Sequence, residues 1–321
     1  MAAEPLAPGM GLTDLRFLRS SAFAGLLEEE IRDWRERFCW DFTPSANLVR
    51  RFVDQRSLAG YALVEGSEVT GYAYCVTDEP KGLIGDLYVR ASHRTCQTEN
   101  RLLAAAVDLL LRAPGVSRIE TQLMLMESKP GPWLPGARYL RQYERQFMVI
   151  DLDRAAALAP RPDAQARIHP WQDRFQEAAA GVVAEAYRGH IDGAINDQYR
   201  SLAGARRFLF NIIQYPGCGS FCPPASFVAM DPATGVMRGV SLAGSVGRDA
   251  GHITQVCVTP AARGRGLGYE LLRQSLAALR RMGYARCSLT VTSVNRDAVA
   301  LYERMGFRSA CRFLALVWEG F

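Results

Sequence analysis

The chain has 321 residues, of which 49% are hydrophobic and 22% are charged, a composition that supports a large buried core and excludes a disordered or fibrous protein. At roughly 150 residues per domain, this length favours two domains over one. The net charge of +5 is small, and no run of basic residues is interleaved with aromatic ones, so we expect no nucleic-acid partner.

The sequence also argues against a membrane protein and a metalloprotein. It holds no apolar run of about 18 residues, and its first residues lack the basic and apolar segments of a targeting signal. The eight cysteines are scattered and mostly lie in apolar stretches, which is typical of reduced, buried thiols. Only Cys218 and Cys222 lie close together, and the chain has four histidines, so we expect no metal site. These observations predict a cytoplasmic protein.

The first half of the chain contains both helical and extended patterns. Apolar residues that recur at helical spacing predict helices, and alternating or continuous apolar runs predict strands. The predicted elements are a helix over residues 22–38, strands over 61–65, 69–76 and 83–89, a helix over 99–112, and strands over 118–126 and 146–152. An alanine-rich stretch with two prolines follows. We expect residues 1–155 to form one domain and residues 156–166 to form a linker.

Residues 167–321 are expected to form the second domain. The predicted elements are a strand over 167–169, helices over 173–187 and 205–213, strands over 226–230, 236–246 and 252–258, a helix over 267–282, a strand over 286–292, a helix over 296–305 and a closing strand over 312–318. A turn signal at residues 231–235 joins two strands into an antiparallel hairpin, and the later strand–helix–strand order implies a parallel crossover. The predicted fold class is therefore α/β (α+β) with a mixed sheet.

One sequence pattern occurs in both halves. Residues 86–103 align without a gap with residues 255–272, so that Val89 corresponds to Val258 and Arg94 corresponds to Arg263. A repeat of this length indicates two copies of a whole domain, because the units of a solenoid are much shorter.

The second copy contains a glycine-rich loop, Arg-Gly-Arg-Gly-Leu-Gly-Tyr at residues 263–269, between a predicted strand and a predicted helix. Glycines let the backbone turn several amides toward one point, and a helix start carries a partial positive charge, so the loop suits a pyrophosphate. A dinucleotide fingerprint does not fit, because Tyr269 occupies the place of its last glycine. A nucleoside-triphosphate loop would need Gly-Lys-Ser/Thr, which is absent. A flexible glycine turn without a ligand is the remaining alternative.

The loop satisfies the pattern Arg/Gln-x-x-Gly-x-Gly/Ala through Arg263, Gly266 and Gly268. With Val-Cys-Val-Thr-Pro before it and Asn-Arg-Asp-Ala-Val-Ala-Leu-Tyr-Glu-Arg-Met-Gly-Phe at 295–307 after it, this half closely resembles the GNAT superfamily of acyl-CoA-dependent N-acetyltransferases. The resemblance is detailed over residues 167–321 and holds in outline over the first half. It implies two tandem GNAT domains and acetyl-CoA as co-substrate.

The resemblance implies a role for each residue that matches its motifs. Backbone groups of Val256, Cys257 and Val258, on a strand that splays from its neighbour, would pair with the pantetheine arm of acetyl-CoA. The amides of the glycine-rich loop, with the Arg263 side chain nearby, would hold the pyrophosphate. The residues of this loop are Arg263, Gly264, Arg265, Gly266, Leu267, Gly268 and Tyr269.

Two residues after the loop also match the family. Asn295 matches a position that often contacts the cofactor arm, and an N-cap of the following helix explains this residue equally well. Tyr302 matches the tyrosine that in many members protonates the CoA thiolate. This proton transfer is nearly balanced, because the phenol has a pKa near 10 and the thiolate is similarly basic. The alternative for Tyr302 is a packing residue on a short amphipathic helix.

The general base is the point at which the sequence departs from the family. Gln255 stands where many relatives carry Glu or Asp, and an amide cannot take a proton. His252 is a candidate base on the same strand, with a solvent-facing histidine at a strand edge as the alternative. Polar residues between 190 and 199, or an ordered chain of water, are further candidates, so the sequence alone assigns no base. We expect Cys257 to pack in the core rather than to act as a nucleophile.

The first copy is expected to bind no cofactor. Gln97 and Glu99 replace the glycines that correspond to Gly266 and Gly268, and their side chains would obstruct a diphosphate. We therefore predict one acetyl-CoA per chain. The first domain would complete the acceptor pocket, or pair with the second domain as two GNAT subunits pair in a dimer, and such internal pairing fits a monomeric chain.

The resemblance thus predicts an N-acetyltransferase. The primary amine of a small molecule or peptide would attack the thioester of acetyl-CoA directly, in a ternary complex. The alternative, motivated by Gln255, is a sensor module that binds acyl-CoA without transferring the acyl group.

Overall fold

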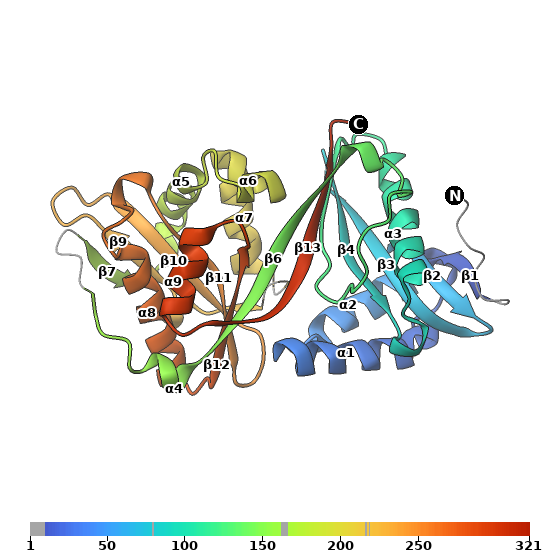
Figure 1. The fold of residues 1–321 in the computed structure, drawn as a ribbon, viewed down its shortest axis with the longest axis horizontal. Helices are drawn as coiled ribbons and strands as arrows, with labels where there is room; N and C mark the ends of the chain where they lie inside the picture. The colour runs from blue at the N-terminus through green and yellow to red at the C-terminus, as the bar shows by residue number, and fades with distance from the viewer. Residues whose placement is uncertain (1–9, 79, 162–165, 216, 218) are drawn as a thin grey trace. The chain divides into compact units, whose positions relative to one another are not determined.

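The computed structural model describes residues 10–78, 80–161, 166–215, 217 and 219–321. Two compact units make up the fold (Figure 1). The first unit contains the chain up to residue 144 together with residues 313–321, and the second unit contains residues 145–312. In each unit, helices pack on both faces of a run of hydrogen-bonded strands.

The first unit has the strand order β1-β2-β3-β4-β5-β13. Its neighbouring strands are antiparallel except β4 and β5, which run parallel. Leucines and alanines of α3 pack on one face, and α1 lies on the other, where the Tyr72 hydroxyl donates to Glu30. The elements are β1 Met10–Asp14, α1 Ala24–Phe38, α2 Thr43–Asp54, β2 Ala59–Glu65, β3 Glu68–Asp78, β4 Lys81–Val89, α3 Cys96–Leu111, β5 Arg118–Gln122 and the end of β13 Arg308–Glu319.

The second unit has the strand order β6-β12-β11-β10-β9-β7, with the short β8 beside β10. Within it, β11 and β12 run parallel, and the other printed pairs are antiparallel. The mixed sheet expected from the sequence is therefore confirmed. The elements are β6 Leu140–Asp151, α4 Leu152–Ala155, β7 Arg167–Pro170, α5 Gln176–Ala186, α6 Asp192–Ile195, α7 Leu202–Gln214, β8 Ser220–Phe221, β9 Phe227–Met230, β10 Met237–Ser245, β11 Ala250–Val258, α8 Leu267–Arg281, β12 Arg286–Thr292 and α9 Arg296–Arg304.

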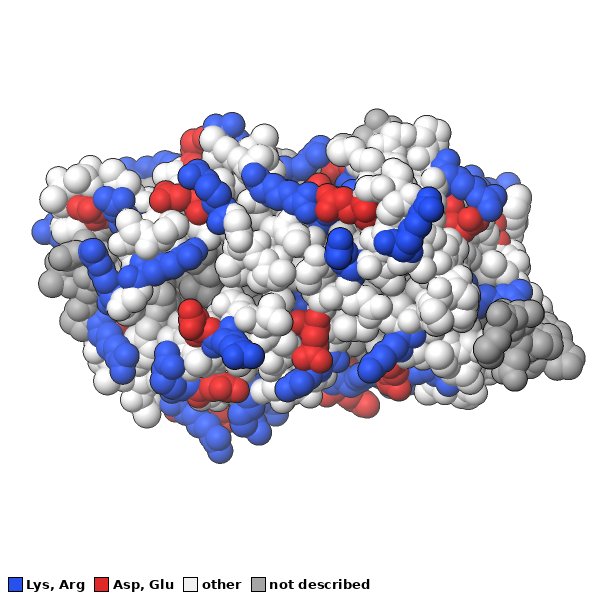
Figure 2. Space-filling model, turned by 45° about the horizontal axis from the view of Figure 1, so that its top comes forward, with Lys and Arg blue, Asp and Glu red and all other residues white. Residues whose placement is uncertain are grey.

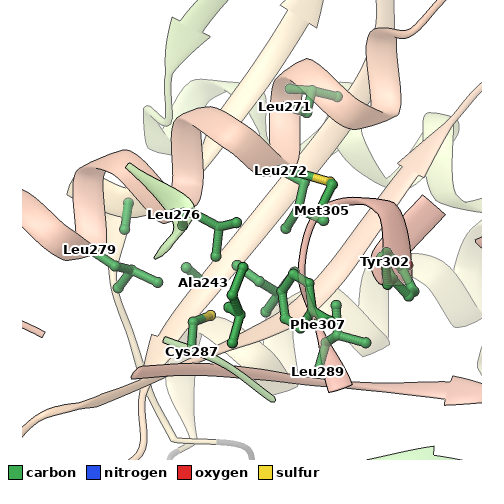
Figure 3. Packing of buried hydrophobic residues seen from close by; sticks show 14 of the residues in the cluster. Ala243, Leu271, Leu272, Leu276, Leu279, Cys287, Leu289, Tyr302, Met305 and Phe307 are labelled. Atoms are coloured by element: carbon green, nitrogen blue, oxygen red, sulfur yellow. The ribbon is translucent and has the colours of Figure 1, made fainter. Parts of the chain in front are cut away.

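Alternation along the strands sends core side chains of the second unit to two faces. Val228 and Leu242 pack with α5 and α7, whereas their neighbours Ala229 and Ala243 pack with α8. Figure 3 shows the α8 side of this core, where a leucine stripe at helical spacing meets residues of β12 and α9. The labelled leucines of α8 are Leu271, Leu272, Leu276 and Leu279, and burying each contributes about 2 kcal/mol.

The last strand of each predicted domain completes the other unit. Residues 145–151 of β6 pair with β12, and residues 315–319 of β13 pair with β5. The structure therefore divides the chain differently from the expected domains 1–155 and 167–321. Apolar patterning identified both strands correctly, but it carries no information about which sheet edge a strand will join.

The expected linker is also part of the second unit where the structure describes it. The Ala159 carbonyl accepts a hydrogen bond from the Tyr269 hydroxyl at 2.9 Å, and the Arg161 amide donates to Glu270 at 3.0 Å. Residues 162–165 of the expected linker lie outside the described residues. Five of the described elements, β1, α2, α4, α6 and β8, were not predicted from the sequence.

Charged side chains of both signs are interspersed over the face drawn in Figure 2, in keeping with the small net charge. The ion pairs of the second unit include Arg206–Glu177 and Arg280–Asp153. Along the described chain, no helix is both long enough and apolar enough to cross a bilayer. The described residues hold no group of three or more His, Cys, Asp or Glu suited to a metal ion, and Cys218 of the expected close pair lies outside them.

Candidate functional site

The site begins where two parallel strands of the second unit part. The ladder between β11 and β12 covers Ala250–Ile253 and residues 286–289, but the strands run on to Val258 and Thr292. The pairing of β11 with β10 skips Thr254, which marks a β-bulge at the point of parting. Residues 256–258 stay paired to β10 only, so their other edge is available to an extended ligand. This is the splay that the family resemblance implies.

The glycine-rich loop ends at the start of α8 with an open helix terminus. Gly264 and Gly266 have φ of 76° and 80°, and a Cβ at either position would meet no atom within 4 Å. Gly266 is the N-cap, and no side chain caps the amides of the first turn. The first four amides at such a terminus lack helical partners, and the helix dipole favours an anion there. The arrangement therefore suits a phosphate group.

The corresponding helix start in the first unit is closed by its own side chains. Thr95 caps α3 and exchanges hydrogen bonds with Thr98 in a capping box. The Glu99 carboxylate is buried and accepts hydrogen bonds from the amides of Glu127 and Ser128. This contrast supports the prediction that only the second copy of the loop binds a diphosphate.

Arg263 and Tyr269 fasten this loop and the first turn of α8 to neighbouring segments. The Arg263 guanidinium donates to the carbonyl of Ala186, the last residue of α5, at 2.6 Å. The Tyr269 hydroxyl donates to Ala159, and its ring lies 4.9 Å from the guanidinium carbon of Arg161. Arg265 is exposed. Sequence reasoning placed Arg263 near a pyrophosphate and did not foresee its bond to α5.

Tyr302 lies on α9 and is buried, with 7% of its surface exposed. Burial raises the pKa of its phenol well above the usual range, and the nearby Asp192 and Cys257 add to this effect. The phenol is thus protonated at neutral pH. Its hydroxyl has no hydrogen-bond partner among the described residues, and its ring packs against Phe307, 5.9 Å between centroids (Figure 3). Both the packing role and a proton-donor role are compatible with this position.

The structure gives Asn295 the N-cap role. Its Oδ1 accepts from the amide of Ala298 at 3.4 Å, at the start of α9. Its Nδ2 lies 3.3 Å from Nε2 of His190. Contact with a cofactor arm stays a prediction for this residue.

The environment of His252 is that of a packing residue. Its ring is buried between strands, stacks 6.2 Å from Phe147, and places Nδ1 2.9 Å from the Ser288 hydroxyl. Burial lowers the pKa of the imidazole to about 3, with a smaller contribution from Arg145. A group with this pKa is a poor proton acceptor at neutral pH, so the assignment of His252 as the base is wrong. The solvent-facing alternative is also wrong, because the ring is buried.

The side-chain amide of Gln255 forms hydrogen bonds with two tyrosines, Tyr187 and Tyr199. Its Nε2 donates to the Tyr187 hydroxyl at 2.9 Å, and its Oε1 accepts from the Tyr199 hydroxyl at 3.4 Å. The two tyrosine rings stack with centroids 4.3 Å apart. On the same strand, burial raises the pKa of the Cys257 thiol to about 12, which agrees with the expected packing role and not with a nucleophile.

The polar segment between 190 and 199 lies at the same site. The Asp192 carboxylate, at the start of α6, accepts a hydrogen bond from the hydroxyl of Thr292, the last residue of β12. Nδ1 of His190 lies 3.7 Å from this carboxylate, and the edge of the His190 ring meets the face of Tyr187. Sequence reasoning singled out this segment, but it did not identify Tyr187 or Thr292.

Comparison with known proteins agrees with these features. The model of the acetyltransferase (GNAT) family matches residues 197–307. A stretch of 59 residues is 37% identical to the uncharacterized N-acetyltransferase YjgM of Escherichia coli (strain K12). A stretch of 61 residues is 38% identical to the mycothiol acetyltransferase of Corynebacterium jeikeium (strain K411). These alignments span 18% and 19% of this chain and only 35% and 18% of the two relatives.

Solved structures resemble the chain over nearly its whole length. A GCN5-related N-acetyltransferase from Sphaerobacter thermophilus superposes with a TM-score of 0.66 at 19% identity, covering 98% of this chain and 97% of that one. A tandem GNAT protein from the clavulanic acid biosynthesis pathway gives a TM-score of 0.59 at 16% identity, covering 97% and 98%. At these identities the likeness establishes the fold, and the predicted tandem GNAT architecture is confirmed.

Proposed function

We propose that this chain, which belongs to the acetyltransferase (GNAT) family, transfers an acetyl group from acetyl-CoA to the primary amine of a small molecule or peptide. The observation that carries the proposal is the uncapped start of α8 at Gly266, next to the open edge of β11. One feature suits a diphosphate and the other suits an extended amide-containing arm, and acetyl-CoA contains both.

The residues of the second unit fit this co-substrate. The amides of residues 264–269 would bind the pyrophosphate, and backbone groups of residues 256–258 would pair with the pantetheine arm. In the first unit the corresponding helix start is occupied by Thr95 and Thr98. We therefore propose one acetyl-CoA per chain, bound by the second unit.

The reaction needs a proton for the departing sulfur. The amine nitrogen would bond to the thioester carbon and lose a proton to solvent, the carbon–sulfur bond would break, and the CoA thiolate would take a proton from the Tyr302 phenol, which solvent would then reprotonate. Burial that raises the pKa of the Tyr302 phenol also raises that of the neighbouring Cys257 thiol to about 12. A CoA thiolate in the same surroundings would be similarly basic, so proton transfer from the phenol stays close to balance.

A sensor that binds acyl-CoA without transferring the group is the second candidate. Gln255 favours it, because its amide is tied to two tyrosines and cannot take a proton. Release of free CoA thiol from acetyl-CoA, measured with a panel of polyamines, lysine peptides and aminoglycosides, separates the two. We expect release with at least one amine. Binding of acetyl-CoA without release across the panel would instead establish the sensor.

A further inference from the structure

We propose that the acceptor is a short-chain diamine, and that the carboxylate of Asp192 binds its second ammonium group while the other amine reacts. The inference names the substrate class of the proposed function and rests on that function. It is carried by the place of Asp192 in the site, and by the lack of a cation beside this carboxylate among the described residues.

Asp192 lies beside the opening between the parted strands. The segment that carries it, between α5 and α7, makes hydrogen bonds to both sides of this opening. On the β11 side, Tyr187 and Tyr199 bond to Gln255. On the β12 side, the Asp192 carboxylate accepts from the hydroxyl of Thr292, the last residue of that strand. Asp192 therefore lies next to the gap in which the thioester would sit.

The negative charge of Asp192 acts on the reacting end of the site. Burial is the main cause of the raised pKa of the Tyr302 phenol, and Asp192 is the next. Because the interaction between two charged groups weakens with distance, the carboxylate lies close to the proton donor proposed for the CoA sulfur. A ligand group bound to Asp192 is therefore only a short chain away from the amine that reacts.

No lysine or arginine of the described residues pairs with this carboxylate. Its side-chain partners are the Thr292 hydroxyl and the His190 ring, whose Nδ1 lies 3.7 Å from a carboxylate oxygen. The same Nδ1 accepts a hydrogen bond from the Asp192 backbone amide at 3.2 Å, so it carries no proton and the imidazole is neutral. Arg145, opposite Thr292 on β6, donates to Thr290. The charge of Asp192 thus has no counter-ion from these groups.

A carboxylate in these surroundings favours a cationic ligand. The side chain of Asp192 is 15% exposed, so it is largely withdrawn from water but can still be reached. A charge withdrawn from water is costly unless it is paired. The Thr292 hydroxyl uses one of the lone pairs of the carboxylate, and the others remain for an ammonium group.

The bound ammonium is not the nitrogen that reacts. The reacting nitrogen must be unprotonated when it attacks the thioester, whereas a carboxylate nearby favours the protonated form of an amine. Asp192 therefore suits a second ammonium group, which stays charged throughout the reaction. An acceptor with a carboxylate in the place of this group would be repelled, and one with a methyl group would leave Asp192 unpaired.

The test compares three acceptors that differ only at the far end of the chain. The second ammonium of putrescine is replaced by a methyl group in pentylamine and by a carboxylate in δ-aminovalerate. The full chain is assayed for release of the CoA thiol from acetyl-CoA, which gives kcat/KM for each amine. For the wild type we expect putrescine to exceed pentylamine by about 10-fold or more, the scale of a hydrogen bond between charged groups. We expect δ-aminovalerate to be the poorest acceptor.

Asp192→Asn separates the charge from the shape of this side chain, because its amide oxygen can still accept from Thr292. We expect kcat/KM for putrescine to fall about 10-fold, while kcat/KM for pentylamine and the acetyl-CoA Kd stay within about twofold. Asp192→Glu, which keeps the charge, should retain a preference for putrescine. The control is Asp249→Asn, which removes an exposed carboxylate between β10 and β11 and should match the wild type.

The outcomes separate this inference from the proposed function. Equal kcat/KM for putrescine and pentylamine in the wild type, or a preference that Asp192→Asn retains, would overturn the assignment and leave the proposed function standing. Release of CoA with other amines but with none of this series would do the same. A wild-type protein that releases CoA with no amine would overturn the proposed function, and this assignment with it.

Discussion

The side-chain amide of Gln255 donates a hydrogen bond to the Tyr187 hydroxyl at 2.9 Å and thereby ties β11 to the end of α5. The position at which the family resemblance implies an acid instead holds two aromatic side chains in place. Tyr187 in turn stacks on Tyr199, and the edge of the His190 ring meets its face. Gln255 therefore positions two tyrosines beside the parted strands.

We expect Gln255→Met to weaken acceptor binding more than co-substrate binding. Methionine keeps the length of the side chain but removes both hydrogen bonds to the tyrosines, each worth about 1 kcal/mol. The acceptor KM should rise about 10-fold, whereas the acetyl-CoA Kd measured by calorimetry should stay within about twofold. Equal losses in both constants would show that Gln255 supports the site as a whole.

Tyr302→Phe should lower turnover and leave acetyl-CoA affinity intact. The ring remains to pack on Phe307, but the proton for the CoA sulfur is lost, and such a loss costs about 100-fold in kcat. The control is Tyr284→Phe, which removes a hydroxyl beyond the other end of α8. Steady-state kinetics and calorimetry on both variants check the prediction. Unchanged turnover in Tyr302→Phe would leave this tyrosine with the packing role alone.

The sequence predicted the backbone of the loop better than the assembly of the sheet. Gly264 and Gly266 were identified because their backbone conformation and the helix that follows are local properties of the chain. The exchange of residues 145–151 and 315–319 was missed, because strand pairing is decided between distant segments. The assignment of His252 as a base failed for a similar reason, since only the fold shows that Phe147 and Ser288 enclose its ring.

The strand exchange predicts a crossed pattern of destabilisation. Trp318 is fully buried in the core of the first unit, and Met148 is fully buried in the core of the second. Trp318→Ala should therefore destabilise the first unit by about 3–5 kcal/mol, and Met148→Ala should destabilise the second by about 2–5 kcal/mol. Hydrogen exchange read by mass spectrometry should lose protection in α3 and β5 for Trp318→Ala, and in α8 and β12 for Met148→Ala. The reverse pattern would refute the observed pairing.

A buried acidic pair should make the first unit less stable as pH rises. Burial raises the pKa of Asp86 to about 6, and burial together with Asp86 raises the pKa of Glu30 well above its usual value. Since the folded pKa of Asp86 exceeds its ordinary value of 3.8, the stability it contributes is present at low pH and is lost as pH rises through about 6. The loss amounts to about 1–3 kcal/mol.

The double variant Glu30→Gln/Asp86→Asn should remove this pH dependence, because neither amide ionises. Denaturant unfolding of the first unit, followed between pH 5 and pH 7 by hydrogen exchange of its peptides, measures the effect. Asp108→Asn, a change on the exposed side of α3, should keep the wild-type slope. A wild-type slope in the double variant would show that the buried pair does not control it.

The binding of acetyl-CoA at the start of α8 is tested most directly by calorimetry on two matched glycine variants. Gly266 and Gly235 have φ of 80° and 68°, and a Cβ at either site would meet no protein atom within 4 Å. Alanine at each position should therefore lower the free energy of unfolding by a similar amount, about 1 kcal/mol. We predict that the wild type and Gly235→Ala bind one acetyl-CoA per chain with similar Kd. For Gly266→Ala we expect the Kd to rise at least about 10-fold, because a disturbed phosphate contact costs about 1.4 kcal/mol or more of binding free energy. Equal affinity in the two variants, or two bound molecules per chain, would contradict the account.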